Sequence, residues 1–197
     1  MIAMVLENLN HYNVVLASKS PRRQELLKGM GVKFVILTKE TPENHPEMPF
    51  EAVPEYLSRQ KSLAFTEEEL PANYLLVTAD TVVIAENEIL GKPVDRDDAL
   101  RMLRLLSGKT HQVVTGVTVR SKDKTESFFA VSEVTFAVLD REEMEHYVDQ
   151  YRPYDKAGAY GIQEWIGYVG ISGLQGSFYN VMGLPTRKLY QTLKEFK

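Results

Sequence analysis

Cysteine is absent from this chain of 197 residues. A disulfide framework, a thiolate nucleophile and a cysteine-based zinc site are therefore impossible, which is consistent with a reducing compartment. Long apolar runs are absent too, because Tyr74–Ala79, Thr81–Ala85 and Phe136–Leu139 are all far shorter than the roughly 20 residues that cross a bilayer. Met1–Asn10 lacks the basic stretch of a secretory signal. We expect neither a membrane span nor a cleaved leader.

An excess of positive charge is also lacking. Lys and Arg number 23 against 27 Asp and Glu, which gives a formal net charge of −4. Proteins that bind nucleic acid usually carry a large basic excess, so we expect no stable nucleic-acid binding, while a local basic pocket for a small anion stays compatible. The apolar fraction of 44% is typical of a packed globular protein, and the length fits one domain.

Short apolar runs and helical periodicities alternate irregularly along the chain. Strands are predicted at Val14–Ala17, Lys33–Leu37, Tyr74–Ala79, Val82–Ala85, Gln112–Arg120 and Phe128–Leu139, the last two as an antiparallel hairpin. Helices are predicted after Ser20, over Val53–Ala64, after Asp95 as its cap, and over Asp140–Tyr151 and Pro185–Phe196, and short strands are expected around Gly167–Ile171. In the helix Asp140–Tyr151, we expect Met144, Tyr147 and Val148 to face inward. This mixture predicts an α/β fold: a single domain with two lobes around a twisted mixed β-sheet flanked by helices.

The stretch from Ser18 to Arg23 joins the first predicted strand to a helix. Ser20 is a good N-cap and Pro21 suits the first helical turn. Arg22 and Arg23 fall in that turn, where cations are unfavourable unless an anion joins them. Backbone N–H groups at a helix start and guanidinium groups both suit phosphate oxygens. A phosphate site and a capped helix with two solvated arginines both fit these residues.

Three ionisable side chains lie at positions typical of catalytic or ligand-binding residues. Asp80 ends a predicted buried strand, where open sheets place ligands, and it either binds a metal, accepts a proton or caps the junction. Lys61 falls on the apolar face of its helix, so it either snorkels or meets an anion. Lys92, between Gly91 and Pro93, either neutralises phosphate charge or lies in water.

A late segment, Asp155–Gln163, is rich in small residues that permit close approach to a ligand. Gln163 offers both a donor and an acceptor, so it could read the edge of a base. A tight loop packed on the sheet is the alternative.

Taken in order, these stretches resemble the Maf family of nucleoside triphosphate pyrophosphatases. The matching segments are Leu16–Arg23, Ala79–Val83, Leu90–Pro93, Leu106–Val113, Asp155–Gln163 and Val181–Pro185. The resemblance implies one Maf/ITPase-like domain over residues 1–197. It implies a cytoplasmic nucleotide diphosphatase that cleaves a small-molecule nucleoside triphosphate between the α and β phosphates, with Mg²⁺ or Mn²⁺ as cofactor, and it is compatible with a homodimer.

Site residues follow from the same resemblance. The family's proton acceptor falls on Asp80, and an acidic residue of the family falls on Glu40, so that Asp80 and Glu40 are the expected metal ligands. The other expected catalytic and phosphate-facing residues are Lys61, Lys92, Arg23, Ser18 and Ser20. Lys39 stands where the family usually has Asp, which argues against a pair of carboxylates in this loop.

Substrate choice is implied as well. In the dTTP/UTP pyrophosphatase branch the three selectivity positions are Arg, Thr and Gln, and here they are Arg22, Thr81 and Gln163. The branch that acts on 7-methyl-GTP carries a bulky aromatic residue, Gln and Glu at its positions, and none of these is present. Two alternatives stay open: a non-catalytic nucleotide- or nucleic-acid-binding regulator of cell division, and a pyrophosphatase for non-standard purine triphosphates, against which Arg22 and Gln163 argue.

Overall fold

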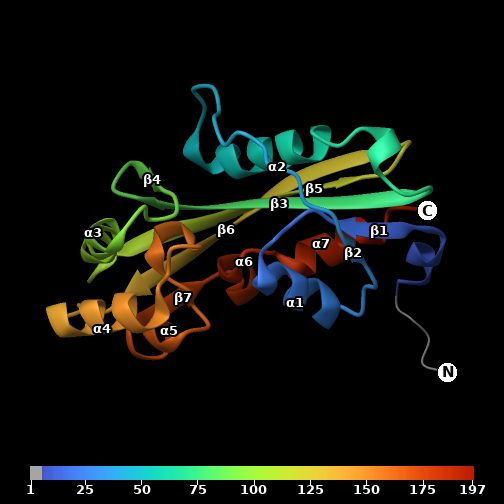
Figure 1. Ribbon diagram of the computed structural model, residues 1–197. Helices are drawn as coiled ribbons and strands as arrows, with labels where there is room; N and C mark the ends of the chain where they lie inside the picture. Colours follow the sequence, from blue (N-terminus) through green and yellow to red (C-terminus); the bar gives the residue numbers. More distant parts are fainter. Residues whose placement is uncertain (1–5) are drawn as a thin grey trace. The chain divides into compact units, whose positions relative to one another are not determined.

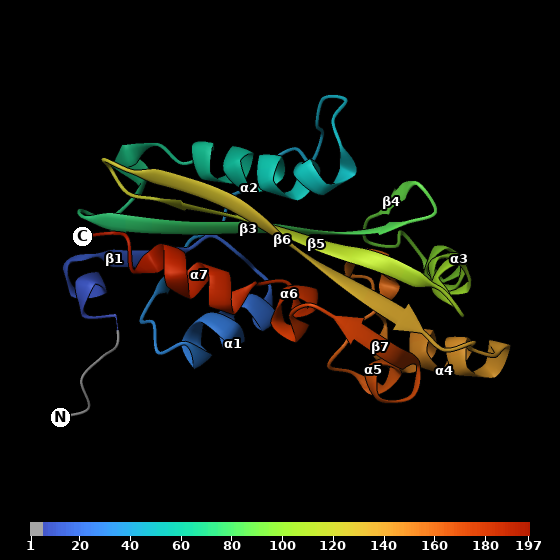
Figure 2. The same cartoon turned by 180° about the vertical axis from the view of Figure 1, so that it is seen from behind.

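The computed structural model describes residues 6–197 (Figures 1 and 2). The strands are β1 (Asn13–Leu16), β2 (Val35–Ile36), β3 (Tyr74–Ala85), β4 (Glu88–Leu90), β5 (Thr110–Arg120), β6 (Thr125–Phe136) and β7 (Ile171–Gln175). The α-helices are α1 (Pro21–Gly29), α2 (Val53–Leu63), α3 (Arg96–Leu106), α4 (Arg141–Tyr151), α5 (Trp165–Val169), α6 (Phe178–Met182) and α7 (Thr186–Leu193), and the short 3₁₀ helices are η1 (Glu7–His11), η2 (Phe50–Ala52), η3 (Glu67–Glu69) and η4 (Ala157–Ala159). None of the helices described for residues 6–197 combines the length and the apolar character that a bilayer span demands. The first half of the segment Met1–Asn10, where no leader is expected, lies outside the described residues.

The strands form one seven-stranded mixed sheet in the order β2-β1-β3-β5-β6-β7, with β4 paired to β3. β1 is parallel to both β2 and β3, whereas β4 is antiparallel to β3 and β7 to β6. β5 and β6 are neighbours joined by only four residues, a connection too short for parallel strands. The predicted α/β class with a mixed sheet flanked by helices is confirmed.

The chain divides into two compact units, and β3, β5 and β6 each contribute residues to both. Unit 1 is Met1–Asp80, Thr115–Ala130 and Gly183–Lys197. In this unit α2 covers one face of the strands, and α1 and α7 cover the other (Figures 1 and 2). Part of its core is an apolar cluster of buried side chains, namely Val15, Phe65, Leu70, Tyr74 and Leu76.

Gly116 sets the position of α2 against β5 in unit 1. A Cβ at this glycine would lie 2.2 Å from backbone atoms of Pro54 and Glu55, at the beginning of α2. Only a residue without a side chain permits this approach. The close packing of strand and helix thus fixes the helix that carries Lys61.

Unit 2 is Thr81–Val114 and Val131–Met182. Asp95 accepts a hydrogen bond from the Asp98 N–H at the start of α3, so the predicted cap is confirmed. The turn between β3 and β4 places Glu86 and Asn87 at φ of 45° and 65°, the conformation of the tight hairpin turns that match strand twist.

Asp80 does not end a strand, contrary to the prediction. β3 continues through it to Ala85 as one strand of 12 residues. The two predicted strands join because the residues that follow, Thr81, Val82 and Val83, are β-branched and suit a strand. The Asp80 carboxylate therefore projects from the middle of a strand.

The segment around Gly167–Ile171 was also predicted wrongly. It forms the helix α5 and the first residue of β7 rather than short strands. A Cβ at Gly167 would lie 1.7 Å from the Ile162 carbonyl oxygen, so the turn of α5 is packed directly on the preceding loop. This close contact with a residue five positions earlier needs a glycine and belongs to a compact turn rather than to the predicted strands. Ser20 occupies the N-cap position of α1, but its side chain makes no capping hydrogen bond.

Candidate functional site

The start of α1 presents two arginines and a buried serine in unit 1. Ser18 is 7% exposed, and its Oγ accepts hydrogen bonds from the Ser20 N–H at 3.2 Å and from Arg23 Nη1 at 3.5 Å. Arg22 and Arg23 are both half-buried in the first turn. Two cations at a helix N-terminus oppose the helix dipole, so this turn is well suited to an anion.

Arg23 reaches from α1 to β3. Its Nε donates to the Gly183 carbonyl at 2.8 Å, and its Nη1 donates to the Ala79 carbonyl at 2.9 Å. Burial lowers the pKa of Arg23, an effect that the negative charge of Asp80 opposes. A guanidinium keeps its proton in proteins, so Arg23 remains a cation held beside the backbone that leads into Asp80.

Lys61 from α2 makes the closest contact with Asp80. Its Nζ lies 2.5 Å from Asp80 Oδ1 and 3.2 Å from Glu43 Oε1. The side chains of Lys61 and Asp80 are 20% and 10% exposed, whereas that of Glu43 is 55% exposed. Of the two alternatives that the sequence left for Lys61, the structure shows an ion pair with two carboxylates. We call Arg23, Lys61, Asp80 and Glu43 the Asp80 cluster.

The sequence pattern did not point to Glu43. It lies in the irregular loop before η2, where no periodicity distinguishes it from its neighbours. Glu40, which the resemblance selects, is paired instead with Lys19 at 3.5 Å, and its side chain is 94% exposed. Lys39, the residue in place of the usual Asp, donates to both Glu69 carboxylate oxygens at 2.7 and 2.9 Å.

Unit 2 carries the remaining candidates. Thr81 is half-buried on β3, directly after Asp80, and Lys92 is exposed. The Gly158 N–H donates to the Gly91 carbonyl at 3.0 Å, which ties the late loop to the residue before Lys92. Gly158 has a φ of +69°, and a Cβ there would lie 2.8 Å from Val83 Cγ2, so glycine is required at this approach.

Gln163 has an unsatisfied acceptor. Its Oε1 is buried, with no hydrogen-bond partner among residues 6–197. A buried polar atom without a partner costs free energy, and in native proteins such an atom often awaits a ligand or a water molecule. This observation favours a ligand-reading role over the alternative of a tight, fully packed loop.

A network of charged and polar side chains surrounds the same loop and was missed by the sequence analysis. Lys156 pairs with Asp155 and Glu164, and Tyr147 from α4 bonds to Glu164 and to the Gly161 N–H. Tyr147 was predicted to face inward from α4, but nothing in the sequence pairs it with a loop 14 residues away.

A divalent metal would find few protein ligands here. Within residues 6–197, three or more His, Asp or Glu side chains do not gather anywhere in an arrangement that could hold an ion. Mg²⁺ needs no such cage, because it commonly binds through one or two carboxylates and substrate phosphates while keeping several waters. The single buried carboxylate of the Asp80 cluster therefore fits a divalent cation that takes its other ligands from water or from a bound anion.

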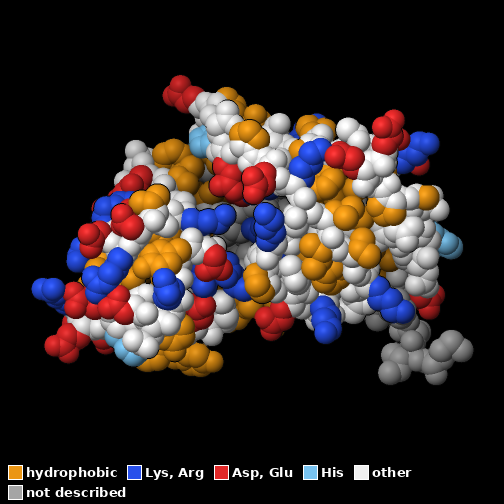
Figure 3. Space-filling model, viewed as in Figure 1, with side chains coloured by type: hydrophobic (Ala, Val, Ile, Leu, Met, Phe, Trp, Pro, Cys, Tyr) orange, Lys and Arg blue, Asp and Glu red, His pale blue; other side chains and the backbone are white. Residues whose placement is uncertain are grey.

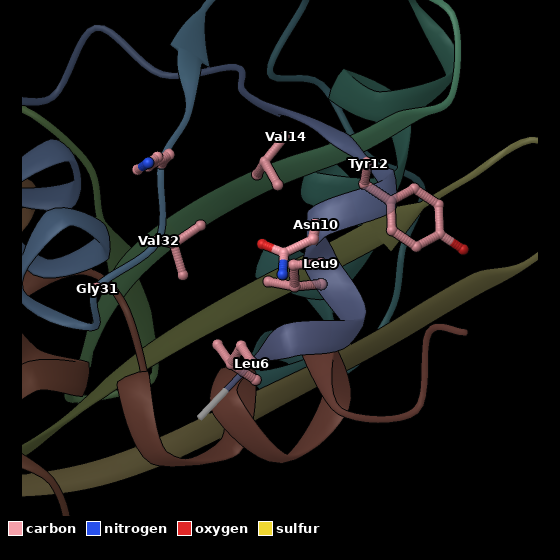
Figure 4. A pocket seen from close by; sticks show the side chains of 8 residues that line it. Leu6, Leu9, Asn10, Tyr12, Val14, Gly31 and Val32 are labelled. Atoms are coloured by element: carbon pink, nitrogen blue, oxygen red, sulfur yellow. The ribbon is translucent and has the colours of Figure 1, made fainter. Parts of the chain in front are cut away.

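One face of the surface and one pocket add little to this description. On the face drawn in Figure 3, acidic and basic side chains are interspersed. A pocket of about 260 Å³ in unit 1 lies beside η1 and the end of α1 (Figure 4). Its lining is mostly apolar and contains none of the candidate residues: Leu6, Leu9, Asn10, Tyr12, Val14, Gly31, Val32 and Lys33.

Comparison with known families decides the relationship. A family model described as Maf-like protein matches residues 13–196. The chain belongs to the Maf family. The resemblance seen in the sequence motifs is thus confirmed, and the match of this Maf chain includes the described strands and α-helices.

Three curated relatives of this Maf protein are all named dTTP/UTP pyrophosphatase. The protein from Bacteroides fragilis (strain YCH46) is 50% identical over 97% of this chain and 100% of its own length. That from Porphyromonas gingivalis (strain ATCC 33277) is 52% identical over 98% of both chains, and that from Flavobacterium psychrophilum is 46% identical over 95% of this chain and 96% of its own. A solved nucleoside-triphosphatase / dITP/XTP pyrophosphatase from Mycobacterium abscessus covers 91% of this chain at 12% identity with a TM-score of 0.42, which is too low to support an inference.

Proposed function

We propose that this Maf protein hydrolyses dTTP and UTP to the nucleoside monophosphate and pyrophosphate. Relatives that are 46% to 52% identical over nearly the full chain carry the corresponding name. The observation that carries the proposal is the approach of Lys61 to Asp80 at 2.5 Å, with Arg23 held on the adjacent Ala79 carbonyl. We further propose that residues 1–197 act as one catalytic domain, because the family match spans residues of both units. The family resemblance is our reason for proposing a cytoplasmic location.

The basic residues of unit 1 are suited to the phosphate end of the substrate. Arg23 is fixed by two backbone carbonyls, so it can meet a phosphate oxygen without losing its position. Lys61 shares its charge between Asp80 and the more exposed Glu43, and a phosphate oxygen can take the place of Glu43. Ser18, Ser20, Arg22 and Lys92 complete the proposed phosphate contacts.

Asp80 is the proposed proton acceptor. An ionised carboxylate beside a bound triphosphate can orient the attacking water and take its proton. Lys61 fixes the direction of this carboxylate through the 2.5 Å contact. The cations around it then stabilise the negative charge that develops on the phosphate oxygens in the transition state.

A divalent cation, Mg²⁺ or Mn²⁺, is the proposed cofactor, and Asp80 is its proposed protein ligand. Glu40, the second ligand that the family resemblance implies, pairs with Lys19 in the structure and would have to leave that pair to contact the ion. When bound, such an ion neutralises phosphate charge and polarises the bond to be cleaved.

Gln163 is suited to the base end. Uracil and thymine present an N3–H donor between two carbonyl oxygens, whereas cytosine presents an acceptor at N3. The unsatisfied Gln163 Oε1 can accept from that N3–H while the Gln163 amide nitrogen donates to a neighbouring carbonyl. A base that offers an acceptor in this position leaves buried polar atoms unpaired, which costs several kcal/mol. Thr81 and Arg22 are the other proposed selectivity residues.

The test is a substrate screen. The purified protein is incubated with dTTP, UTP, the other common triphosphates and dITP, with Mg²⁺ or Mn²⁺, and pyrophosphate and orthophosphate are measured separately. We expect pyrophosphate from dTTP and UTP at least tenfold faster than from dCTP. Binding of dTTP without turnover under either metal would support the regulator instead, and preferential turnover of dITP would support the purine enzyme.

A further inference from the structure

The loop that carries Gln163 is held at both ends by one buried cation. The side chain of Lys156 is 9% exposed, and its Nζ lies 2.7 Å from Asp155 Oδ1 and 3.1 Å from Glu164 Oε1. Lys156 and Glu164 bracket Gln163 in the sequence. The Lys156–Glu164 pair, whose side chains are 9% and 21% exposed, fixes its two residues relative to each other, because an unpaired buried charge would be costly.

The Tyr147 hydroxyl closes the same segment from α4. It donates to Glu164 Oε2 and accepts from the Gly161 N–H at 2.9 Å. Tyr147 is 0% exposed. Burial and the neighbouring Glu164 raise the pKa of Tyr147, so the hydroxyl keeps its proton and remains a donor to the carboxylate.

The segment between these anchors leaves Gln163 little freedom. The Glu164 N–H donates to the Gly161 carbonyl at 3.0 Å, which closes a tight turn around Gln163. A Cβ at Gly161 would lie 3.0 Å from Gln163 Nε2, from Glu164 Cδ and from Lys156 Cε. Gly161 is thus the point on which the Gln163 amide and the two charged side chains converge.

We propose that Tyr147 is a positioning residue that determines base selectivity by holding the turn that carries Gln163, together with Glu164 and Lys156. The inference rests on the proposed function, since it assumes that Gln163 reads the base. Its physical basis is that a hydrogen bond discriminates between bases only when its donor and acceptor are held in place before the base arrives. We call Tyr147, Lys156, Gly161 and Glu164 the loop network.

The test compares Tyr147→Phe with the wild type on dTTP and dCTP. The variant removes one hydroxyl and keeps the ring, and we expect the ratio of kcat/KM for dTTP over dCTP to fall about tenfold, mainly through a higher KM for dTTP. Tyr151→Phe is the matched control, because it removes the hydroxyl of a 40% exposed tyrosine on the same helix, whose ring stacks on that of Tyr147. The control should keep the wild-type ratio.

A double-mutant cycle separates positioning from general damage. If Tyr147 acts through Gln163, adding Tyr147→Phe to Gln163→Ala should not lower the ratio further. A further fall in that background, or an unchanged ratio in Tyr147→Phe alone, would overturn the inference. Thermal unfolding checks that each variant is folded. If Tyr147→Phe fails to fold, Glu164→Gln replaces it, because this substitution weakens the same anchor and leaves Tyr147 intact.

Different results would contradict the proposed function and the inference about Tyr147. A wild type that releases no pyrophosphate from dTTP or UTP overturns the proposed function and the inference together. A wild type that is selective for dTTP, with a Tyr147→Phe variant equally selective, overturns the inference alone.

Discussion

The Asp80 cluster of unit 1 and the loop network of unit 2 each join a lysine to one shielded and one exposed carboxylate, but the loop network also contains a buried hydroxyl. Lys61 pairs with Asp80, which is 10% exposed, and with Glu43, which is 55% exposed. Lys156 pairs with Glu164, which is 21% exposed, and with Asp155, which is 57% exposed, and the buried Tyr147 hydroxyl also donates to Glu164. An exposed carboxylate contributes little net stability and can be exchanged for a ligand, whereas a hydrogen-bonded network with a buried member holds its geometry. We therefore expect the Asp80 cluster to bind a ligand and the loop network to hold its loop in position.

Asp80→Asn is expected to cause the largest loss of activity. The amide keeps the size of the carboxylate but cannot accept a proton, so we expect pyrophosphate release from dTTP to fall about 10³-fold. The measurement is steady-state turnover together with the melting temperature, which should stay close to that of the wild type. Glu43→Gln is the control, because Glu43 contacts Lys61 but is not the proposed proton acceptor. This variant should retain far more activity than Asp80→Asn. Equal losses in the two variants would contradict the assignment of Asp80.

Acid should destabilise unit 2 through its buried histidine. His111 is 3% exposed, its Nε2 lies 2.7 Å from the Tyr160 hydroxyl, and burial lowers the pKa of His111 to about 4. The unfolded chain binds the proton near pH 6.5 and the folded protein only near pH 4, so this contribution is complete above pH 6.5 and is lost as the pH falls to 4. The loss is on the order of 3 kcal/mol.

Urea unfolding at several pH values checks this prediction. His111→Gln should reduce the fall in stability between pH 6.5 and 4, whereas His146→Gln, at an exposed ring, should follow the wild-type profile. Identical pH profiles for His111→Gln and the wild type would show that the carboxylates alone account for the acid sensitivity.

Gly116→Ala sharpens the comparison by moving the helix that carries Lys61. The new Cβ meets the backbone of Pro54 and Glu55 at 2.2 Å, which a small side-chain shift cannot relieve. We expect a loss of about 2 kcal/mol in the free energy of unfolding. We also expect kcat to decrease by more than the loss of folded protein accounts for. Gly29→Ala is the control, because a Cβ there meets nothing within 4 Å. A Gly116→Ala protein as stable as this control would contradict the described packing.

Asp149→Asn should have the smallest effect. Asp149 forms a bidentate pair with Arg96 at 2.6 and 2.9 Å, which lowers the pKa of Asp149. The pair lies in solvent, where screening and side-chain entropy cancel most of the attraction. We expect no resolvable change in melting temperature or in turnover at 0.15 M salt, about physiological ionic strength. A clear loss of stability would show that exposure is a poor guide to the value of these ion pairs.

Sequence reasoning succeeded where local chemistry decides. The Asp95 cap and the inward face of α4, with Met144, Tyr147 and Val148 buried, follow from nearest neighbours and helical spacing. It failed at Asp80, where strand-forming residues on both sides continue β3, and around Gly167, where packing on the Ile162 carbonyl replaced a strand with a helix.

The sequence by itself determined the family, the mixed α/β class and the residue types of the site, because these depend on order, periodicity and motif. Only the tertiary structure decided the partners of those residues. It assigned Glu43 to Lys61, and it joined Tyr147 to the loop around Gln163. Apolar spacing indicates which side chains are buried but not which distant segment they meet, and the pairing of buried polar groups across the fold leaves no periodic trace along the chain.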